Sequence, residues 1–187
     1  MNSEEQPSTA VPQSKPSRTP TFVIRPESLQ DAAAIESVTR EAFAHHPHSR
    51  QTEQFIVRAL REAGALALSL VAERSGQVVG HVAFSPVTVS DGSRGWFGLG
   101  PVSVLPSLQK QGIGRSLIES GLSMLRERGA AGCVLVGEPA FYRRFGFAND
   151  PGLLLQEVPR EFFLARAFGP AHPQGEVSFH AAFAAEA

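Results

Sequence analysis

The stretch that decides the fold runs from residue 102 to residue 115 and reads VSVLPSLQKQGIGR. Its β-branched, apolar beginning predicts a strand, which Pro106 ends. A few polar residues follow, then the pattern Gly112-x-Gly114, and apolar residues at helical spacing begin at Ile113. These residues therefore predict a strand, a glycine-rich turn and the first turn of a helix.

The predicted helix start has the properties of an anion-binding site. The first amide N–H groups of a helix have no intrahelical partner, and the helix dipole places partial positive charge there. Gly112 and Gly114 lack the Cβ atoms that would hold a ligand away from the backbone, and Lys110 and Arg115 add positive charge. We therefore expect the turn to bind a phosphate or diphosphate. A glycine turn without a ligand is the alternative.

Two common phosphate-binding motifs are excluded. A P-loop requires Gly, four residues, and then Gly-Lys-Ser/Thr, and the chain contains no such run. A dinucleotide-binding fingerprint requires a third Gly or Ala three residues after the second glycine, where this chain has Leu117. The ligand must therefore be sought among other phosphorylated cofactors.

The glycine turn belongs to a longer resemblance. The spacing Gln-x-x-Gly-x-Gly at positions 109–114 resembles the acyl-CoA-binding motif of the GCN5-related N-acetyltransferases (GNAT). Downstream, Tyr-x-x-x-Gly-Phe at positions 142–147 resembles the element that follows the fifth strand in the same superfamily. The wider run GEPAFYRRFGF at 137–147 resembles a subgroup of small bacterial N-acetyltransferases. The resemblance covers residues 21–149 and extends more weakly towards Phe183.

The resemblance implies an α/β (α+β) GNAT fold. This fold has a central mixed, mostly antiparallel sheet with helices on both faces, and two central strands splay apart to hold the cofactor. Residues 21–187 would form a single N-acetyltransferase domain, with the core motifs in 21–149 and the C-terminal strands in 150–187. Residues 1–20 contain four prolines among polar residues, so we expect a disordered N-terminal extension.

Hydrophobic periodicity locates the individual elements. Helices are predicted over residues 29–43, 54–63 and 113–128, with a short helix opening at Pro139. Strands are predicted over residues 21–25, 67–72, 78–84 with a continuation through 87–89, 96–104, 133–136 and 176–183. The last of these would be an antiparallel edge of the sheet.

The implied activity is transfer of an acetyl group from acetyl-CoA to a primary amine, by direct attack in a ternary complex and without a metal. By the resemblance, the Val102 N–H faces the acetyl oxygen and the Val104 backbone binds pantetheine, whereas the side chains of both valines belong to the core. The full set of cofactor-binding residues would be Val102, Val104, Gln109, Lys110, Gln111, Gly112, Ile113, Gly114 and Arg115.

Acid and base residues are needed for this reaction. The resemblance makes Tyr142, the single tyrosine of the chain, the general acid that protonates the departing thiolate; its alternative role is aromatic packing. Many relatives carry a glutamate base on the strand before the glycine turn, but residues 97–104 contain no acid. His81 and Glu138 are the candidate bases. His81 could instead be an ordinary sheet residue, and a chain of waters would need no dedicated base.

Composition limits the other classes of function. The net charge is −1 and the estimated pI is 6.6, which gives no electrostatic case for binding nucleic acid or an anionic membrane. Cys133 is the single cysteine and lies in an apolar run, which favours a buried structural thiol over a nucleophile. No apolar stretch approaches the length of a membrane span and no signal-peptide core is evident, so we expect a cytoplasmic protein.

Three histidines cluster around Pro47, at positions 45, 46 and 48. A metal site would need carboxylate or cysteine partners at fixed spacing, and none is evident, so a solvated loop is the favoured interpretation.

Two further functions compete with catalysis on a small-molecule or peptide amine. The chain could be a non-catalytic acyl-CoA-binding sensor, which the missing strand acid favours and the retained Tyr142 opposes. It could also be a scaffold with a ligand-free glycine turn. The sequence leaves the oligomeric state open, a homodimer included.

Overall fold

The computed structural model describes residues 22–47, 49–170 and 172–187, so the predicted extension over residues 1–20 lies outside the described part. The main sheet has six strands in the order β1-β2-β3-β5-β6-β8. Their bounds are Val23–Pro26 for β1, Leu68–Arg74 for β2, Gln77–Pro86 for β3, Trp96–Val104 for β5, Gly132–Val136 for β6 and Phe163–Ala167 for β8. Every neighbouring pair is antiparallel except β5 and β6, which confirms the predicted mixed, mostly antiparallel sheet.

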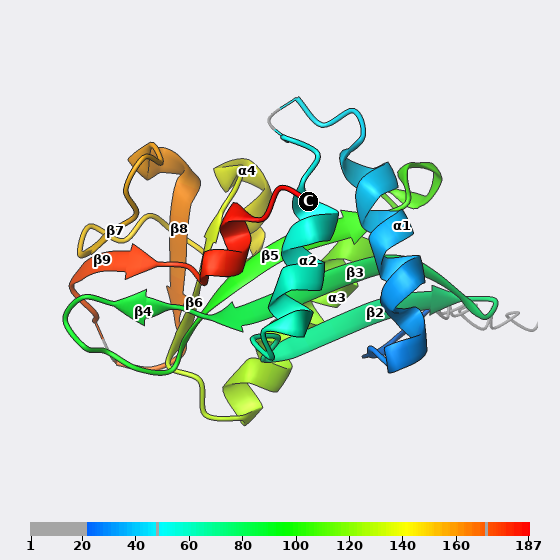
Figure 1. Ribbon diagram of the computed structural model, residues 1–187. Coiled ribbons are helices and arrows are strands. Elements are labelled where there is room, and N and C mark those ends of the chain that lie inside the picture. Colours follow the sequence, from blue (N-terminus) through cyan, green and yellow to red (C-terminus); the bar gives the residue numbers. More distant parts are fainter. Residues whose placement is uncertain (1–21, 48, 171) are drawn as a thin grey trace, which may run out of the picture.

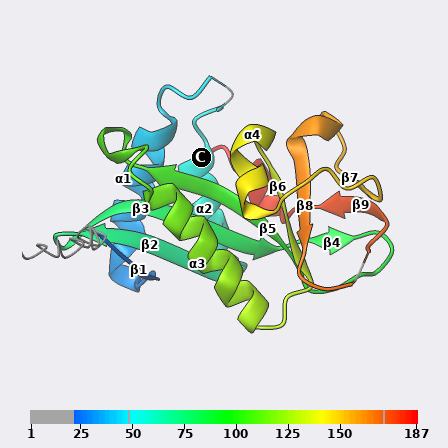
Figure 2. The same cartoon turned by 180° about the vertical axis from the view of Figure 1, so that it is seen from behind.

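Helices cover both faces of this sheet (Figures 1 and 2). The helices α1 (Ala32–Phe43) and α2 (Glu53–Glu62) lie on one face, and α3 (Ile113–Glu127) lies on the other. The predicted apolar stripe of α3 is buried against the sheet, with none of its members more than 4% exposed: Ile113, Leu117, Ile118, Leu122 and Leu125. Helical spacing thus placed the helix that carries the glycine turn correctly.

A second, smaller sheet corrects two sequence-based predictions. It consists of β4 (Thr88–Val89), β9 (Gly175–Ser178) and β7 (Leu153–Leu154). Residues 87–89 do not continue the preceding strand, because β3 ends at Pro86 and β4 pairs with β9. The predicted strand 176–183 is also too long, because Ala181–Ala184 form the 3-10 helix η5. The two antiparallel edges of the main sheet are β1 and β8, and β9 belongs to the smaller sheet.

Short helical segments connect these elements. They are η1 (Leu29–Asp31), η2 (Pro106–Leu108), α4 (Pro139–Tyr142), η3 (Arg143–Phe145) and η4 (Arg160–Phe162). The first predicted helix therefore starts as a 3-10 turn before α1, whereas α4 opens at the proline as predicted. Within the described residues, no helix combines the length and the apolar character needed to span a bilayer.

The core explains the single cysteine. Cys133 on β6 is 0% exposed and belongs to the cluster packed under α3. Burial raises the pKa of its thiol far above the usual range, because the thiolate would lose its hydration. The predicted burial of this thiol is therefore confirmed.

Candidate active site

The parallel pair of strands at the centre of the sheet opens into a V. The ladder between β5 and β6 joins Trp96–Gly98 to Gly132–Val134, and no further pair connects the two strands in the described structure. The strands therefore separate towards their carboxyl ends, as predicted. Figure 2 shows α3 and α4 on the same side of the molecule with β5 between them.

The opening exposes backbone groups of β5. Leu105 donates its N–H to the Val79 carbonyl of β3 at 3.0 Å. Because successive N–H groups of a strand point to opposite edges, those of Val102 and Val104 face away from β3 and into the opening. The two valine side chains are half-buried against the main core. An extended ligand can therefore pair with this edge in the manner of an added strand.

The start of α3 lies directly beside that edge. A Cβ on Gly114 would be 3.6 Å from Val104 Cγ2, an ordinary contact. Gly112 is the N-cap with a φ of 89°, and no side chain of the described chain caps this helix start. The first amide N–H groups, at residues 112–115, are therefore available to an anion. Gly112 therefore has two roles. Its missing Cβ leaves room for a ligand, as proposed from the sequence, and it also adopts a positive φ that other residues rarely adopt.

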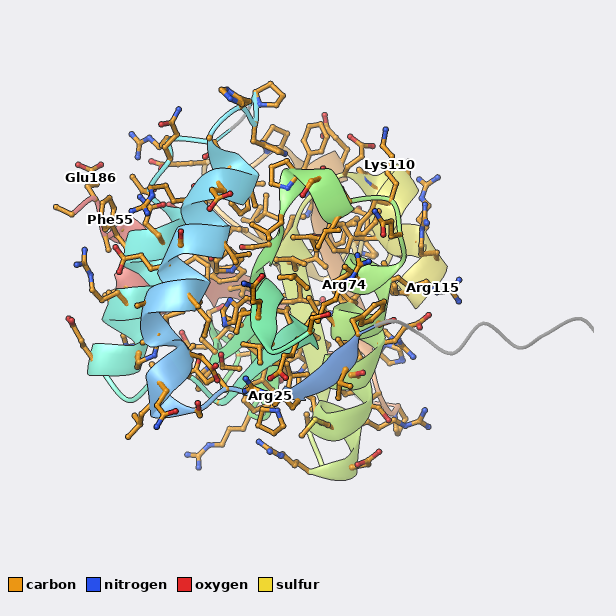
Figure 3. All side chains as sticks on the ribbon, turned by 90° about the vertical axis from the view of Figure 1, so that its right-hand side faces the viewer. Arg25, Phe55, Arg74, Lys110, Arg115 and Glu186 are labelled. Carbon is orange, nitrogen blue, oxygen red and sulfur yellow. The ribbon has the colours of Figure 1, made fainter. Side chains whose placement is uncertain are left out.

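Side chains of the glycine turn divide into two kinds. Gln109 donates from Nε2 to the Val104 carbonyl at 3.1 Å, and Gln111 donates to the Ser107 carbonyl at 3.3 Å, so both glutamines brace the turn. Lys110 and Arg115 are exposed, and Figure 3 shows them on the same side of the molecule. Arg115 also pairs with Glu119 at 2.8 Å. The positive charge expected near the anion site is present at the surface.

Tyr142 lies at the end of α4, just beyond β6. Its ring meets Phe141 edge-on at 4.9 Å between centroids and Phe147 at 6.1 Å. The ring also lies so close to the backbone of Gly137 that no Cβ would fit there. Burial raises the pKa of Tyr142 to about 12, so the phenol stays protonated at neutral pH and can donate a proton. The ring contacts show the packing role of Tyr142, and its role as the general acid stays a prediction.

The two candidate bases occupy different surroundings. Glu138 is exposed and caps α4, accepting the Ala140 N–H at 3.4 Å. His81 is 0% exposed and lies on β3, directly across from Ser103 of β5. Burial lowers the pKa of His81, because the imidazolium would lose its hydration. His81 is therefore held neutral, which is the form that can accept a proton.

The histidines around Pro47 follow α1, as far as they are described. The His46 ring contacts Phe43 in a tilted arrangement, at 5.6 Å between ring centroids, whereas His48 lies outside the described residues. No group of three or more His, Cys, Asp or Glu residues in the described chain could hold a metal ion.

Sequence reasoning missed a row of buried polar residues between the sheet and α1. Ser69 of β2, His81 of β3 and Ser103 of β5 share one face of the sheet, and Ser103 donates to Thr39 of α1 at 3.1 Å. At the outer end, Ser69 contacts Glu27, a connecting residue beyond β1. A signal was available in the sequence, because serines occur within otherwise apolar strands. The alternation of side chains along a strand would have placed these serines on the same face as His81.

A splayed parallel pair with an uncapped helix start beside it defines an acyl-CoA-dependent transferase, and the chain belongs to the GNAT family of acetyltransferases. The model of the Acetyltransferase (GNAT) family matches residues 32–147. Among curated proteins, the uncharacterized N-acetyltransferase YhbS of Escherichia coli K12 is 42% identical over 127 residues, which cover 67% of this chain and 73% of YhbS.

Two solved structures share the fold closely. A GNAT family acetyltransferase from Brucella melitensis, in complex with acetyl-CoA, is 52% identical and has a TM-score of 0.78, covering 88% of this chain and 99% of that one. YhbS from Escherichia coli, in complex with CoA, is 34% identical and has a TM-score of 0.81, covering 91% of this chain and 96% of that one.

Proposed function

We propose that residues 21–187 act as one domain that transfers an acetyl group from acetyl-CoA to a primary amine on a small molecule or peptide. The observation that carries this proposal is the continuity between the open edge of β5 and the uncapped start of α3. A Cβ on Gly114 would come within 3.6 Å of Val104, so the two features form one surface. The acetyl-CoA and CoA complexes of the two similar structures support the choice of co-substrate.

Backbone groups supply most of the cofactor contacts in this proposal. The amides of residues 112–115 bind the diphosphate, and the exposed Lys110 and Arg115 add positive charge beside it. Backbone groups of Val104 pair with the pantetheine amides. The Val102 N–H donates to the acetyl oxygen and stabilises the negative charge that develops there during attack.

The amine attacks the acetyl carbon from the face that carries α1 and α2, since the diphosphate occupies the side where α3 begins. The new N–C bond forms, the C–S bond breaks, and the nitrogen gives up its extra proton to a base. Tyr142 donates its phenolic proton to the departing sulfur and recovers one from solvent. Its raised pKa keeps that proton in place until negative charge appears on the sulfur.

Measuring CoA release over a panel of primary amines tests the proposal. Tyr142→Phe should lower kcat by about 100-fold, because it removes the proton donor, and should leave acetyl-CoA affinity unchanged. Phe141→Leu, which changes a neighbouring ring without a hydroxyl, is the matched control and should lower kcat much less.

Two outcomes would contradict the proposal. If the wild-type protein binds acetyl-CoA but acetylates no amine, the chain is a non-catalytic acyl-CoA-binding module. If Tyr142→Phe loses acetyl-CoA affinity while keeping its rate, the tyrosine is a binding residue rather than the acid.

A further inference from the structure

A chain of hydrogen bonds runs inward from the edge of the sheet to His81. Arg61 of α2 holds Glu27 through two bonds of 3.0 Å. Glu27 Oε2 lies 2.5 Å from Ser69 Oγ, and Ser69 Oγ lies 2.7 Å from His81 Nε2. The Arg61 and Glu27 side chains are 24% and 17% exposed, whereas His81 is fully buried. The chain therefore connects the surface to the interior of the sheet.

The directions of these hydrogen bonds determine the tautomer of His81. Against the opposing effect of burial, the His81 ring 3.7 Å away, the Arg61 guanidinium and the Ser69 hydroxyl lower the pKa of Glu27 to about 2, so the carboxylate is ionised and can only accept. Ser69 must therefore donate its single hydroxyl hydrogen to Glu27. Its oxygen can then only accept from His81, which places the ring hydrogen on Nε2. Nδ1 is left as the basic nitrogen.

This basic nitrogen is buried and has no hydrogen-bond partner within the described structure. Leaving a buried acceptor unpaired costs free energy, which favours a role for Nδ1 in binding or proton transfer. His81 pairs in register with Ser103, whose neighbours Val102 and Val104 carry the open edge of β5. The His81 side chain lies on the face that carries α1 and α2, the face from which the acceptor amine approaches in the proposed function, one strand away from the open edge of β5.

We propose that His81 Nδ1 accepts the proton released by the acceptor amine, and that Ser69, Glu27 and Arg61 position His81 for this step. The proposal rests on the acetyltransferase function proposed above. The neutral amine attacks the acetyl carbon with its free electron pair, and the extra proton that the nitrogen then carries passes to Nδ1, directly or across a water, while the C–S bond breaks and Tyr142 protonates the sulfur. The resulting imidazolium keeps its Nε2–H bond to Ser69, and Nδ1 returns the proton to solvent after product leaves.

Electrostatics around His81 suit a base that recovers its neutral form. Among the described residues, the charged groups that act on its pKa are Glu27, which raises it, and Arg61, which lowers it. The residues that α1 buries, Ile35, Val38 and Thr39, do not titrate, and neither do Ser69 and Val71 of β2 or Ser103 of β5. Removing the charge of Glu27 and removing the charge of Arg61 should therefore shift the pKa of His81 in opposite directions.

The pH profile of kcat/KM tests these opposite shifts in the pKa of His81. Glu27→Gln removes a negative charge, so the acidic limb should move to lower pH by about 1 unit. Arg61→Gln removes a positive charge, so the same limb should move to higher pH by a similar amount. Asp31→Asn, which alters a buried carboxylate paired with Arg25, is the control and should leave the limb in place. A structural role alone would not move the limb in opposite directions, and shifts of one sign would overturn the proposal.

The hydroxyl of Ser69 is tested by a matched pair of serines. Ser69→Ala should lower kcat about tenfold with acetyl-CoA affinity unchanged, because the acceptor of the Nε2 hydrogen is lost. Ser69→Thr retains the hydroxyl and should recover most of the rate. Ser85→Ala removes a buried hydroxyl that lacks a partner on the same face of β3 and should have little effect. Equal losses in Ser69→Ala and Ser69→Thr would overturn the positioning role.

Nitrogen NMR of the histidine side chains separates failure of this proposal from failure of the proposed function, since it needs no turnover. The full-length wild-type protein should show the Nε2–H tautomer for His81, assigned by its loss in His81→Gln. An Nδ1–H tautomer would overturn the inference even if amines are acetylated. If the tautomer is Nε2–H but the protein acetylates no amine, both the proton transfer to His81 and the proposed acetyltransferase function are rejected.

Discussion

The two faces of the main sheet differ in what they bury. Under α3, the buried residues are almost entirely apolar, and Leu70, Phe84 and Leu117 are each 0% exposed. Under α1 and α2, the sheet presents Ser69, His81, Ser85 and Ser103, all buried. The first face fixes the position of the helix whose start is the proposed anion site. The second face retains polar groups, at a cost in desolvation that packing alone would not require, and we propose that His81 among them takes up a proton.

The largest effect is expected on the apolar face. Leu117→Ala should lower the free energy of unfolding by about 3–5 kcal/mol, because it leaves a cavity between α3 and β3, where Leu117 packs beside Gly80. Urea unfolding measures the change. Leu29→Ala, at a leucine that is 92% exposed, is the control and should change stability by less than about 0.5 kcal/mol. A loss below about 1 kcal/mol for Leu117→Ala would mean that packing on the apolar face does not hold α3 in place.

A fall in pH should destabilise the fold mainly through Glu27 and His81 on the polar face. The pKa of Glu27 is lowered to about 2 in the fold, so its contribution is present above about pH 4.5 and is lost as the pH falls towards 2. The loss should reach about 2–3 kcal/mol. The lowered pKa of His81 acts in the same direction below its unfolded value of about 6.5, because only the unfolded chain then gains that proton.

Unfolding free energies measured between pH 7 and pH 2 check this dependence. Glu27→Gln should lose the step below pH 4.5 and should already be less stable than the wild type at pH 7. Parallel curves for the two proteins would contradict the assignment of this step to Glu27.

The glycine turn at the junction of the two faces should respond more weakly. Gly112→Ala should destabilise the free protein by about 1–2 kcal/mol, because the residue has a φ of 89°, and should also weaken acetyl-CoA binding. Gly114→Ala is the control for stability, since Gly114 has no positive φ and its Cβ would be at an ordinary 3.6 Å from Val104 Cγ2. Calorimetric titration and thermal melts of both variants separate the two effects. Equal melting temperatures for both would show that Gly112 serves the ligand alone.

The smallest effect is expected at Ser85. Its buried hydroxyl has no partner in the described structure, so Ser85→Ala should be neutral or stabilising by less than about 1 kcal/mol. Ser103→Ala, which breaks the bond to Thr39, should cost about 1 kcal/mol. Chemical unfolding of both variants measures the contrast. A larger loss of stability for Ser85→Ala than for Ser103→Ala would show that the hydrogen bonds of the polar face do not determine the contribution of each serine.

Local sequence signals carried the prediction of one half of the site. β5 and α3 follow from β-branched runs, glycine spacing and helical periodicity, which operate over a few residues, and Tyr142 was located by its motif. Residues 87–89 show the limit of such signals. Their alternation predicted a strand, but whether that strand continued β3 or joined a second sheet depended on β9, about 90 residues away.

The sequence by itself determined the strand, the glycine turn and the helix of the proposed anion site, because each depends on backbone preferences and spacing within one segment. Only the tertiary structure decided how far β5 and β6 separate and which side chains meet beside the opening. Glu27, Ser69 and His81 come from three separate segments, and their hydrogen bonds exist only in the register that joins β2 to β3. Shifting that register by one residue would turn His81 towards α3, since side chains alternate between the faces of a sheet.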